Sequence, residues 1–432
     1  MSLLAERMFA IDTENAFKVG PHIASIEAQG HDVVKLNLGE PDFNVPEFIK
    51  EEVKRQLDAN NTHYCDPKGI LPLRNAIARQ VSETREIDVS PEQVVVFPGG
   101  KPSIGFTQEM YCNPGDEIIY PSPGFPIYES FIRYVGGVPV PLHLDEEKGF
   151  SFTGDQLAEL ITNKTKMIFL NFPSNPTGGV ATKEQLEGIA KVILERCSDD
   201  VRVYSDEIYE YIIFDGKSHL SIASIDGMAE RTIISSGFSK TFAWTGGRLG
   251  YAVFPTVEEA DVCKNLNINY FSCVPPYNQE GAREAYENPK AKEAIAEMVS
   301  IFQERRDVIV EMLNRIDGIT CLKPGGAFYL FPNVSGVCEK IGAIKLYDEL
   351  PEDIKPHTSP TTLFQMFALY RHHVAVMDRK SFGRIGSEGR HYLRLSCASA
   401  LETLKEGVRR LEAASEDISG FESFVREGKA LY

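Results

Sequence analysis

Several common sequence signals are missing from this chain of 432 residues. The eight cysteines form no C-x-x-C pair, which argues against a zinc site or a disulfide framework and favours reduced thiols. No window approaches 18 uninterrupted apolar residues, so no membrane-spanning helix is expected. The first residues lack a basic segment followed by an apolar stretch, the pattern of a secretory signal peptide. Together these absences predict a cytoplasmic protein.

Runs rich in lysine and arginine are missing as well. With a formal net charge of −17, the chain would repel phosphate backbones, so nucleic acid is not an expected partner. There is no internal repeat and no low-complexity segment. The content of 43% hydrophobic and 25% charged residues is ordinary for a soluble globular protein, which excludes the disordered and fibrous classes.

The chain is long enough for one large domain and a smaller one. From about residue 47 to 290, short β-rich runs alternate with helix-like stretches such as 183–195. Near-continuous apolar strands separated by helices are typical of a mostly parallel sheet covered on both faces, and so of an α/β domain. The predicted strands are 94–97, 117–120, 167–170, 201–204, 232–235 and 251–254.

The pattern changes at about residue 291. The sequence predicts a long helix over 292–315, strands at 327–331, 374–377 and 392–396, and a closing helix near 402–412. We therefore expect a smaller α+β domain over 291–432, an N-terminal arm over 1–46 that forms part of it, and a large domain over 47–290. Residues 333–362 are expected to form a mobile or inserted loop.

The most informative residue is Lys240, which an apolar strand delivers into a turn rich in serine and glycine. A lysine amine condenses with an aldehyde only when it is unprotonated, so it needs a sheltered site that lowers its pKa. Arg248, eight residues later, could bind a phosphate through two parallel hydrogen bonds. Taken alone, the pair could equally be a surface lysine and arginine beside a strand.

Three other motifs follow predicted strands, at the edge where α/β sheets bind ligands. Pro98-Gly-Gly-Lys-Pro-Ser-Ile-Gly105 is a glycine turn that opens a helix and suits a phosphate. Asn171-Phe-Pro-Ser-Asn-Pro-Thr-Gly-Gly179 could be only a turn. In Ser205-Asp-Glu-Ile-Tyr209 a carboxylate at a buried strand end needs a cationic partner, for which a structural salt bridge is the simple alternative.

Together the four motifs suit pyridoxal 5′-phosphate, which has an aldehyde, a phosphate and a basic ring nitrogen. A P-loop nucleotide site is excluded, because Ser239 precedes the lysine where that motif requires glycine and Ile234 occupies its first glycine position. No metal site is predicted.

Four motifs, in this order and spacing, resemble those of class I/II aminotransferases: Asn175-Pro-Thr-Gly178, Ser205–Tyr209, Ser239–Tyr251 and Arg394-Leu-Ser396. Three more match the fold-type-I, aspartate-aminotransferase-like branch: Asn37–Phe43, Tyr64 with Lys68–Arg74, and Pro121–Phe125. The resemblance covers nearly the whole chain. It implies a large domain with a mostly parallel seven-stranded sheet between helices, a smaller α+β domain, and a pyridoxal-phosphate-dependent aminotransferase (EC 2.6.1.-) with ping-pong transfer.

The resemblance also implies a role for each matching residue. Lys240 would bind the cofactor aldehyde covalently and then serve as general acid and base at the substrate Cα. Asp206 would keep the ring nitrogen protonated, so that the ring withdraws electrons from the substrate. Asn175 and Tyr209 would hydrogen-bond the phenolic oxygen of the ring, and Phe125 would stack on it.

The remaining implied contacts concern the phosphate and the substrate. The phosphate would be bound by Ser239, Arg248, the backbone of Gly100 and Lys101, and Tyr64 of a second subunit. This last contact implies a homodimer with shared active sites. Gly39 and Arg394 would receive the substrate α-carboxylate, which a guanidinium matches bidentately, close to Phe125 and Asn175.

The choice of substrate depends on Lys101, whose ammonium could bind a distal carboxylate or could be only a solvated cation at a helix start. We expect aspartate or glutamate as amino donor and 2-oxoglutarate as acceptor. Phe125 and Phe17 would equally accommodate aromatic or long aliphatic side chains.

A pyridoxal-phosphate lyase or synthase acting at Cβ or Cγ is a further alternative, because it would use the same Lys240, Asp206 and Arg394. A transcription regulator is excluded, since residues 1–36 are too short and acidic for a DNA-binding segment.

Some positions depart from the family pattern. Gly237 stands where many relatives have serine or threonine, so a phosphate hydroxyl would be missing or replaced by Ser236 or Ser239. Gly247 stands where tryptophan is usual, with Trp244 three residues earlier. Residues 376–383 replace the usual loop beside the substrate and add Arg379 and Lys380, which could bind a second acidic group or remain solvated.

Overall fold

The computed structural model describes residues 3–12, 14–383, 385 and 389–428. Its centre is a seven-stranded sheet in which β8 runs antiparallel to its neighbours β2 and β7, while all other pairs are parallel. The spatial order is β2 (Val94–Phe97), β8 (Gly250–Val253), β7 (Thr232–Gly237), β6 (Arg202–Asp206), β5 (Thr165–Asn171), β3 (Glu117–Ser122) and β4 (Val138–His143). The expectation of a mostly parallel seven-stranded sheet is confirmed, and six of the strands lie where the sequence predicts them.

The strand that the sequence analysis missed is β4, Val-Pro-Val-Pro-Leu-His, at one edge of the sheet. Two prolines in six residues argue against a strand, because proline has no N–H to donate. Here the even-numbered residues face the sheet: the N–H of Val138 donates to Asp116 O at 2.8 Å and that of Leu144 to Ser122 O at 2.9 Å. By alternation Pro139 and Pro141 face outward, where no hydrogen bond to the sheet is lost.

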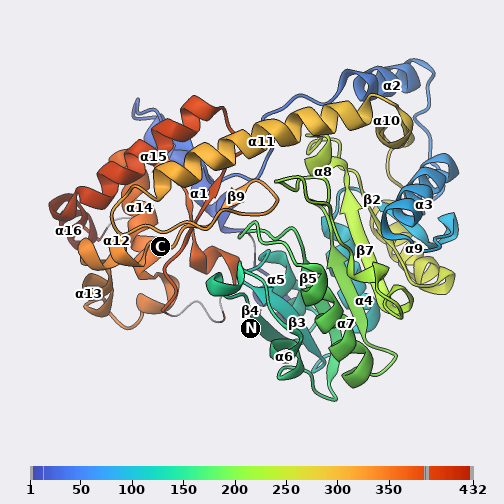
Figure 1. Ribbon diagram of the computed structural model, residues 1–432, viewed down its shortest axis with the longest axis horizontal. Coiled ribbons are helices and arrows are strands. Elements are labelled where there is room, and N and C mark those ends of the chain that lie inside the picture. The colour runs from blue at the N-terminus through green and yellow to red at the C-terminus, as the bar shows by residue number, and fades with distance from the viewer. Residues whose placement is uncertain (1–2, 13, 384, 386–388, 429–432) are drawn as a thin grey trace.

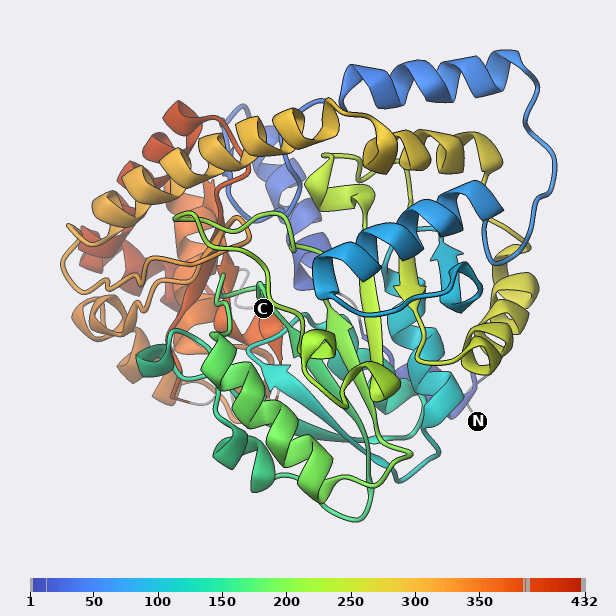
Figure 2. The same ribbon diagram turned by 45° about the vertical axis from the view of Figure 1, so that its right-hand side comes forward.

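Helices cover both faces of the sheet because almost every strand residue is apolar, so that alternate side chains point to opposite sides. On one face Val95, Phe97 and Ile118 pack against α4 (Lys101–Tyr111), α5 (Ile127–Tyr134) and α9 (Val257–Phe271). The other face packs against α3 (Leu71–Arg85) and α10 (Pro276–Glu287) at one end, and against α6 (Gly154–Ala158) and α7 (Lys183–Arg196) at the other. Figures 1 and 2 show α2 (Glu47–Asp58) lying beside α10, at the end of the molecule away from α16 (Ile418–Arg426).

A second core lies beyond α11 (Ala291–Leu313), the long helix that runs across the top of Figure 1. It includes a parallel pair, β1 (Val34–Lys35) with β10 (Val374–Ala375), and a three-stranded antiparallel sheet of β11 (Met377–Asp378), β12 (Leu393–Ser396) and β9 (Tyr329–Leu330). The helices in this region are α1 (Asn15–Glu27), α12 (Ser335–Lys340), α13 (Ala343–Asp348), α14 (Pro360–His372), α15 (Leu401–Glu416) and α16 (Ile418–Arg426). The α+β character predicted for this part is confirmed, while the boundaries after residues 46 and 290 remain predictions.

The expectation of a loop over 333–362 is wrong for much of that segment. Two helices, α12 and α13, occupy it, and Val337, Cys338 and Ile341 are buried in the second core. The acidic and proline-containing stretch that suggested a loop begins only where α13 ends. The helices are six residues each, too short for their apolar spacing to stand out in the sequence.

The remaining helical segments are short. The helix α8 (Phe238–Thr241) directly follows β7. Single 3-10 turns lie at Glu6–Phe9 (η1), Pro91–Gln93 (η2), Glu146–Lys148 (η3), Ile222–Ser224 (η4), Ala229–Arg231 (η5), Lys355–His357 (η6) and Arg379–Phe382 (η7). None of the helices in the described ranges combines the length and the apolar character that a membrane crossing requires.

Candidate active site

A cavity of about 480 Å³ lies at the C-terminal ends of β2, β5, β6 and β7. Eleven of the twelve residues predicted for the site line it: Gly39, Gly100, Lys101, Phe125, Asn175, Asp206, Tyr209, Ser239, Lys240, Arg248 and Arg394. Tyr64 does not line it, and its side chain is 88% exposed. Parallel strands end at the same edge of a sheet, which is how segments far apart in sequence meet here.

Lys240 enters the cavity from α8, and its Nζ donates a hydrogen bond to Gly39 O at 2.6 Å. Burial lowers the pKa of this amine to about 8, although the nearby Glu14 and Glu40 carboxylates act in the opposite direction. The neutral amine that attacks an aldehyde or accepts a proton is therefore far more populated than for an exposed lysine. Gly39 must be glycine, because a Cβ there would lie 2.0 Å from the Tyr329 hydroxyl.

Asp206 ends β6 and is buried. Its Oδ2 accepts a hydrogen bond from the Tyr128 hydroxyl at 2.6 Å, and its Oδ1 accepts one from the N–H of Ile208 at 3.3 Å. Burial raises the pKa of this carboxyl to about 6 despite both hydrogen bonds. No cation pairs with it within the described part of the chain, so the site is a buried acid that a cationic ligand group would complete.

The structural salt bridge considered as an alternative for this segment belongs to the next residue, Glu207. The Glu207 Oε2 lies 2.6 Å from Arg85 Nη2 and 2.9 Å from His219 Nε2, and its Oε1 accepts from the Ser221 hydroxyl at 2.6 Å. Arg85 and His219 hold the pKa of Glu207 well below its usual value, even though burial alone would raise it. Asp206 thus lines the cavity while Glu207 does not, and the pKa values of these adjacent carboxyls are shifted in opposite directions.

An amide network joins β5, β6 and β12. Asn171 donates from Nδ2 to Asp206 O at 3.0 Å, and its Oδ1 accepts from the N–H of Asn175 at 2.9 Å. Asn175 Oδ1 in turn accepts from Arg394 Nη1 at 3.1 Å, so this contact does not use the Asn175 amide N–H groups. The Tyr209 hydroxyl lies 2.7 Å from the Tyr329 hydroxyl.

Arg394 is buried between two aromatic rings, with its guanidinium 4.6 Å from the Tyr329 centroid and 4.7 Å from that of Phe382. Its Nη2 donates to Asn37 O at 2.5 Å. Burial lowers its pKa, and its Nε has no hydrogen-bond partner in the residues that the structure describes. A buried guanidinium with an unused donor, opening onto a cavity, suits a carboxylate ligand.

The other end of the cavity carries Ser239 and Arg248 next to the glycine turn after β2. Arg248 donates only to the backbone oxygens of Thr245 and Pro98, at 2.8 and 3.4 Å, and pairs with no carboxylate among the described residues. A Cβ at Gly99 would lie 2.1 Å from Arg248 Nη2, so glycine permits this approach. The first N–H groups of α4, at the same turn, have no partner within the helix. The arrangement suits a phosphate.

The glycines that depart from the family pattern have steric reasons. At Gly237 a Cβ would lie 2.9 Å from Gly250 Cα and from Leu249 O, so a serine or threonine would crowd β8. Of the two serines considered as replacements, Ser239 lines the cavity, while Ser236 turns away to donate to Glu210 Oε1 at 2.6 Å. At Gly247 a Cβ would lie 2.3 Å from the Trp244 indole, which occupies that space.

Lys101 Nζ forms an ion pair with Glu14, which precedes α1. The ammonium also lies 5.6 Å from the ring centroid of Phe17 and 5.8 Å from that of Phe125. Lys101 is therefore paired with a carboxylate, while its side chain is 48% exposed to solvent. Its charge is matched inside the cavity by a carboxylate of the same chain, which a ligand carboxylate could replace.

The segment 376–383 does not place new charges in the cavity. Arg379 is buried and donates to Ser122 Oγ at 3.0 Å and to Gly383 O at 3.3 Å, so the expectation of a solvated charge is wrong for it. Lys380 donates to Thr358 O at 2.9 Å. Neither side chain lines the cavity around Lys240, and the structure gives no support to their binding a second acidic group of the substrate.

Among the cavity residues that the sequence analysis missed, three make polar contacts with predicted site residues: Tyr128, Tyr329 and Glu14. A signal existed for Tyr128, which follows Phe125 by three residues at the start of α5 and so lies on the same side. Tyr329 falls within the predicted strand 327–331, but nothing in the sequence indicates its partner Tyr209. Glu14 is 87 residues before Lys101, and only the fold brings them together.

These observations fit pyridoxal phosphate, the cofactor expected from the sequence. The lysine is sheltered, the buried acid lacks a counter-cation, and the glycine turn with Arg248 offers donors without a carboxylate partner. Each feature matches one part of the cofactor, namely its aldehyde, its ring nitrogen and its phosphate.

Comparisons with known proteins agree with the site. The sequence model of the family "Aminotransferase class I and II" matches residues 31–411. The chain is 37% identical to a protein of Aquifex aeolicus named "Probable aspartate/prephenate aminotransferase", over 96% of this chain and 99% of that protein. It is 36% identical to the aromatic-amino-acid aminotransferase 2 of Thermococcus litoralis, over 89% and 92%. The crystal structure of the aspartate aminotransferase of Rhizobium meliloti superposes with a TM-score of 0.86 at 30% identity, over 96% and 99%.

The raised pKa of Asp206 predicts a pH-dependent cost to folding. A carboxyl with a higher pKa in the folded than in the unfolded state stabilises the fold at low pH, and this stability is lost as the pH rises through its folded pKa of about 6. In the cofactor-free protein, Asp206→Asn should raise the free energy of unfolding at neutral pH by roughly 2–3 kcal/mol. Urea unfolding across the acidic to neutral range measures this.

The gain in the Asn variant should shrink toward the acidic end of the range, where the wild-type carboxyl is protonated in both states. A gain that is absent at neutral pH, or that does not change with pH, would contradict the assigned burial of an unpaired charge.

Proposed function

Because the chain belongs to the aminotransferase class I and II family, whose members use pyridoxal phosphate, we propose that it transfers the α-amino group of aspartate or glutamate to a 2-oxo acid such as 2-oxoglutarate. That the protein is a pyridoxal-phosphate-dependent aminotransferase follows from its relatives; the choice of substrate is the proposal. One observation carries it: two cations, Arg394 and Lys101, act on the Lys240 amine within one cavity. A dicarboxylic amino acid is the substrate that uses both.

Lys240 is the residue that we assign to proton transfer. Pyridoxal phosphate, when bound, supplies an aldehyde that condenses with amines and a ring that accepts electrons from the substrate Cα. With a substrate bound, the Lys240 amine would remove the Cα proton and return it elsewhere. Its pKa of about 8 suits both directions of transfer near neutral pH.

Asp206 would pair with the ring nitrogen and hold a proton there. Because it is buried and lacks a counter-cation, a protonated nitrogen would stabilise its charged form and lower its pKa. Tyr128 fixes the carboxylate through its hydroxyl. The amide of Asn175 and the hydroxyl of Tyr209 would donate to the phenolic oxygen, and Phe125 would cover one face of the ring.

Arg248, Ser239 and the first N–H groups of α4 at Gly100 and Lys101 would bind the phosphate. At the opposite end, Arg394 with Gly39 would bind the α-carboxylate. The distal carboxylate of aspartate would then take the place of Glu14 beside Lys101. In this exchange Lys101 keeps a carboxylate partner, while Glu14 gives up the cation with which it is paired.

We also propose a homodimer in which Tyr64 of one copy donates to the phosphate in the other. Two features support it: Tyr64 matches the family position for this contact, and it is 88% exposed and does not line the cavity of its own chain. We propose a cytoplasmic location as well, which the eight free cysteines support.

The role of Lys240 is tested by chemical trapping. Borohydride reduction of the holoenzyme should fix a pyridoxyl group on the peptide that contains Lys240, as peptide mass spectrometry would detect. Lys240→Ala should lower turnover by about 10²–10⁴-fold, the usual contribution of a positioned general base. Lys217→Ala, at an exposed lysine that does not line the cavity, serves as control and should keep full activity. Label on another lysine would reject the assignment.

The substrate proposal is tested by Lys101→Met. Loss of a charge-assisted contact to the distal carboxylate should lower kcat/KM for aspartate by about 10–100-fold, which corresponds to ~1.5–3 kcal/mol, and leave that for phenylalanine within about threefold. Lys18→Met is the matched control, because Lys18 is equally exposed and also paired, with Asp12, but does not line the cavity. Equal losses for both donors would overturn an acidic-substrate role for Lys101.

The shared site is tested by Tyr64→Phe, which removes one hydroxyl. The variant should remain dimeric by light scattering and should release pyridoxal phosphate about tenfold faster than the wild type on dilution, because one hydrogen bond to a charged group is lost. A monomeric wild-type enzyme that is saturated with cofactor and fully active would refute the proposal.

A further inference from the structure

The loop between α2 and α3, residues 59–70, combines one very exposed side chain with unusually firm anchoring. Tyr64 is 88% exposed, and no hydrogen bond of its side chain is found within the described ranges. From Cys65 to Ile70, by contrast, nearly every residue is bonded to another element of the same chain. The loop therefore carries an exposed tyrosine next to a firmly anchored segment, residues 65–70.

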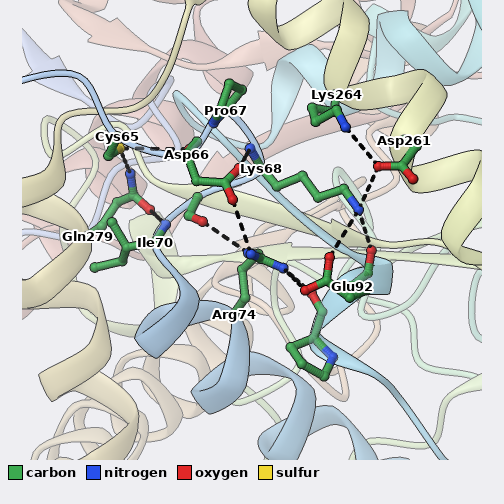
Figure 3. Close-up of polar contacts among 12 residues, drawn as sticks. Cys65, Asp66, Pro67, Lys68, Ile70, Arg74, Glu92, Asp261, Lys264 and Gln279 are labelled. Atoms are coloured by element: carbon green, nitrogen blue, oxygen red, sulfur yellow. Dashed lines mark hydrogen bonds and ion pairs between the residues drawn. The ribbon is translucent and has the colours of Figure 1, made fainter.

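Lys68 connects this anchored segment to two other elements of the chain (Figure 3). Its side chain is only 4% exposed, and its Nζ lies 2.9 Å from Asp261 Oδ1 on α9. The same Nζ donates to Glu92 O, in η2, at 2.9 Å and lies 3.5 Å from Glu92 Oε2. A lysine is rarely buried this deeply unless it is paired.

Arg74, in the first turn of α3, reaches back to the loop from the other side. Its Nε donates to Gly69 O at 3.0 Å, and its Nη2 lies 3.3 Å from Asp66 Oδ2. Its Nη1 donates to Glu92 Oε1 at 2.9 Å, so that Glu92 lies between the two cations (Figure 3). Through these contacts the Arg74 guanidinium binds both the loop and the η2 turn, and Lys68 binds the same turn.

Backbone and amide contacts complete the anchoring. The N–H of Val96 on β2 donates to Lys68 O at 2.8 Å. Gln279 on α10 accepts from the N–H of Ile70 at 2.8 Å and donates to Cys65 Sγ at 3.3 Å. Gly69 has φ 106°, and a Cβ there would lie 2.5 Å from Val96 Cγ2, so glycine is required for the loop to lie this close to β2.

The charges are distributed unevenly in this cluster. The two cations have side chains that are 4% and 5% exposed, whereas the carboxylates of Asp66, Glu92 and Asp261 are 46–49% exposed. Removing a cation would therefore leave carboxylates that water can solvate, rather than a buried unpaired charge. The cluster holds the loop in place, and variants in it are expected to fold.

We propose that Lys68 and Arg74 are positioning residues that fix the α2–α3 loop so that Tyr64 is presented to the phosphate site of a second copy of the chain. The inference rests on the proposed role of Tyr64 and adds the residues through which the chain supports it. A loop that is already ordered loses little conformational entropy when the phosphate contact forms. Without the cluster, Tyr64 would have to be ordered at the moment of binding.

A double-mutant cycle in the holoenzyme separates positioning from general stability. The rate of pyridoxal phosphate release is measured for wild type, Arg74→Met, Lys68→Met and Tyr64→Phe, and for each of the first two combined with Tyr64→Phe. Arg74→Met and Lys68→Met should each speed release about three- to tenfold in the wild-type background. In the Tyr64→Phe background they should speed it less than twofold, because the contact they support is already absent.

Arg79→Met is the matched control. Arg79 lies on the same helix, α3, and pairs with Glu287 at 2.7 Å without reaching the loop. It should leave the release rate unchanged in both backgrounds. Arg74→Lys, which keeps the charge but loses the fork that spans Gly69 and Asp66, should fall between wild type and Arg74→Met.

Hydrogen exchange supplies a readout that does not depend on cofactor. Arg74→Met and Lys68→Met should accelerate amide exchange in peptides covering 59–70 and leave those of α7 unchanged. Unchanged exchange in the loop, or equal acceleration of cofactor release with and without the Tyr64 hydroxyl, would overturn the inference alone. If Tyr64→Phe by itself retained cofactor as the wild type does, the proposed role of Tyr64 would fail and the inference with it.

Discussion

The removal of Asp206 and Lys240 from water is the constraint on which the site depends. Desolvation penalises any isolated charge, so it raises the pKa of the acid and lowers that of the base, and both groups approach neutrality in one cavity. Glu207, one residue further, is equally buried but strongly ionised, because Arg85 and His219 are its permanent partners. Glu207 thus belongs to a structural ion pair, whereas Asp206 is suited to pair with a charged group of a ligand.

The architecture explains how this cavity is assembled from distant segments. The parallel strands β5 and β6 bring Asn171 and Asp206 to one edge of the large sheet, and β7 delivers Lys240 beside them. Arg394 arrives from a different sheet, on β12, and is joined to the first group through Asn175. The site therefore spans both cores, and its geometry depends on how they pack.

Much of this could be read from the sequence, because buried strands are short apolar runs and glycine, asparagine and aspartate follow them at fixed places. Six strands of the main sheet were found in this way, and eleven cavity residues were found through the resemblance of the motifs to those of class I/II aminotransferases. The failures have physical causes. Two prolines made β4 look unlike a strand, and α12 and α13 are too short to show a helical apolar pattern. The charge of Arg379 suggested that it is solvated, whereas the fold buries it. Glu14 and Tyr329 join the site through tertiary contacts that leave no local pattern.

The main sheet has two edge strands, β4 and β2, and an open strand edge is a template on which another molecule can add its own strand. At β4 the outward positions are held by Pro139 and Pro141, which have no N–H to offer an incoming backbone. At β2 the outward N–H of Val96 is already bonded to Lys68. Self-association by sheet extension is thus blocked on both sides, so crowded, concentrated protein should resist fibrillar aggregation along this route.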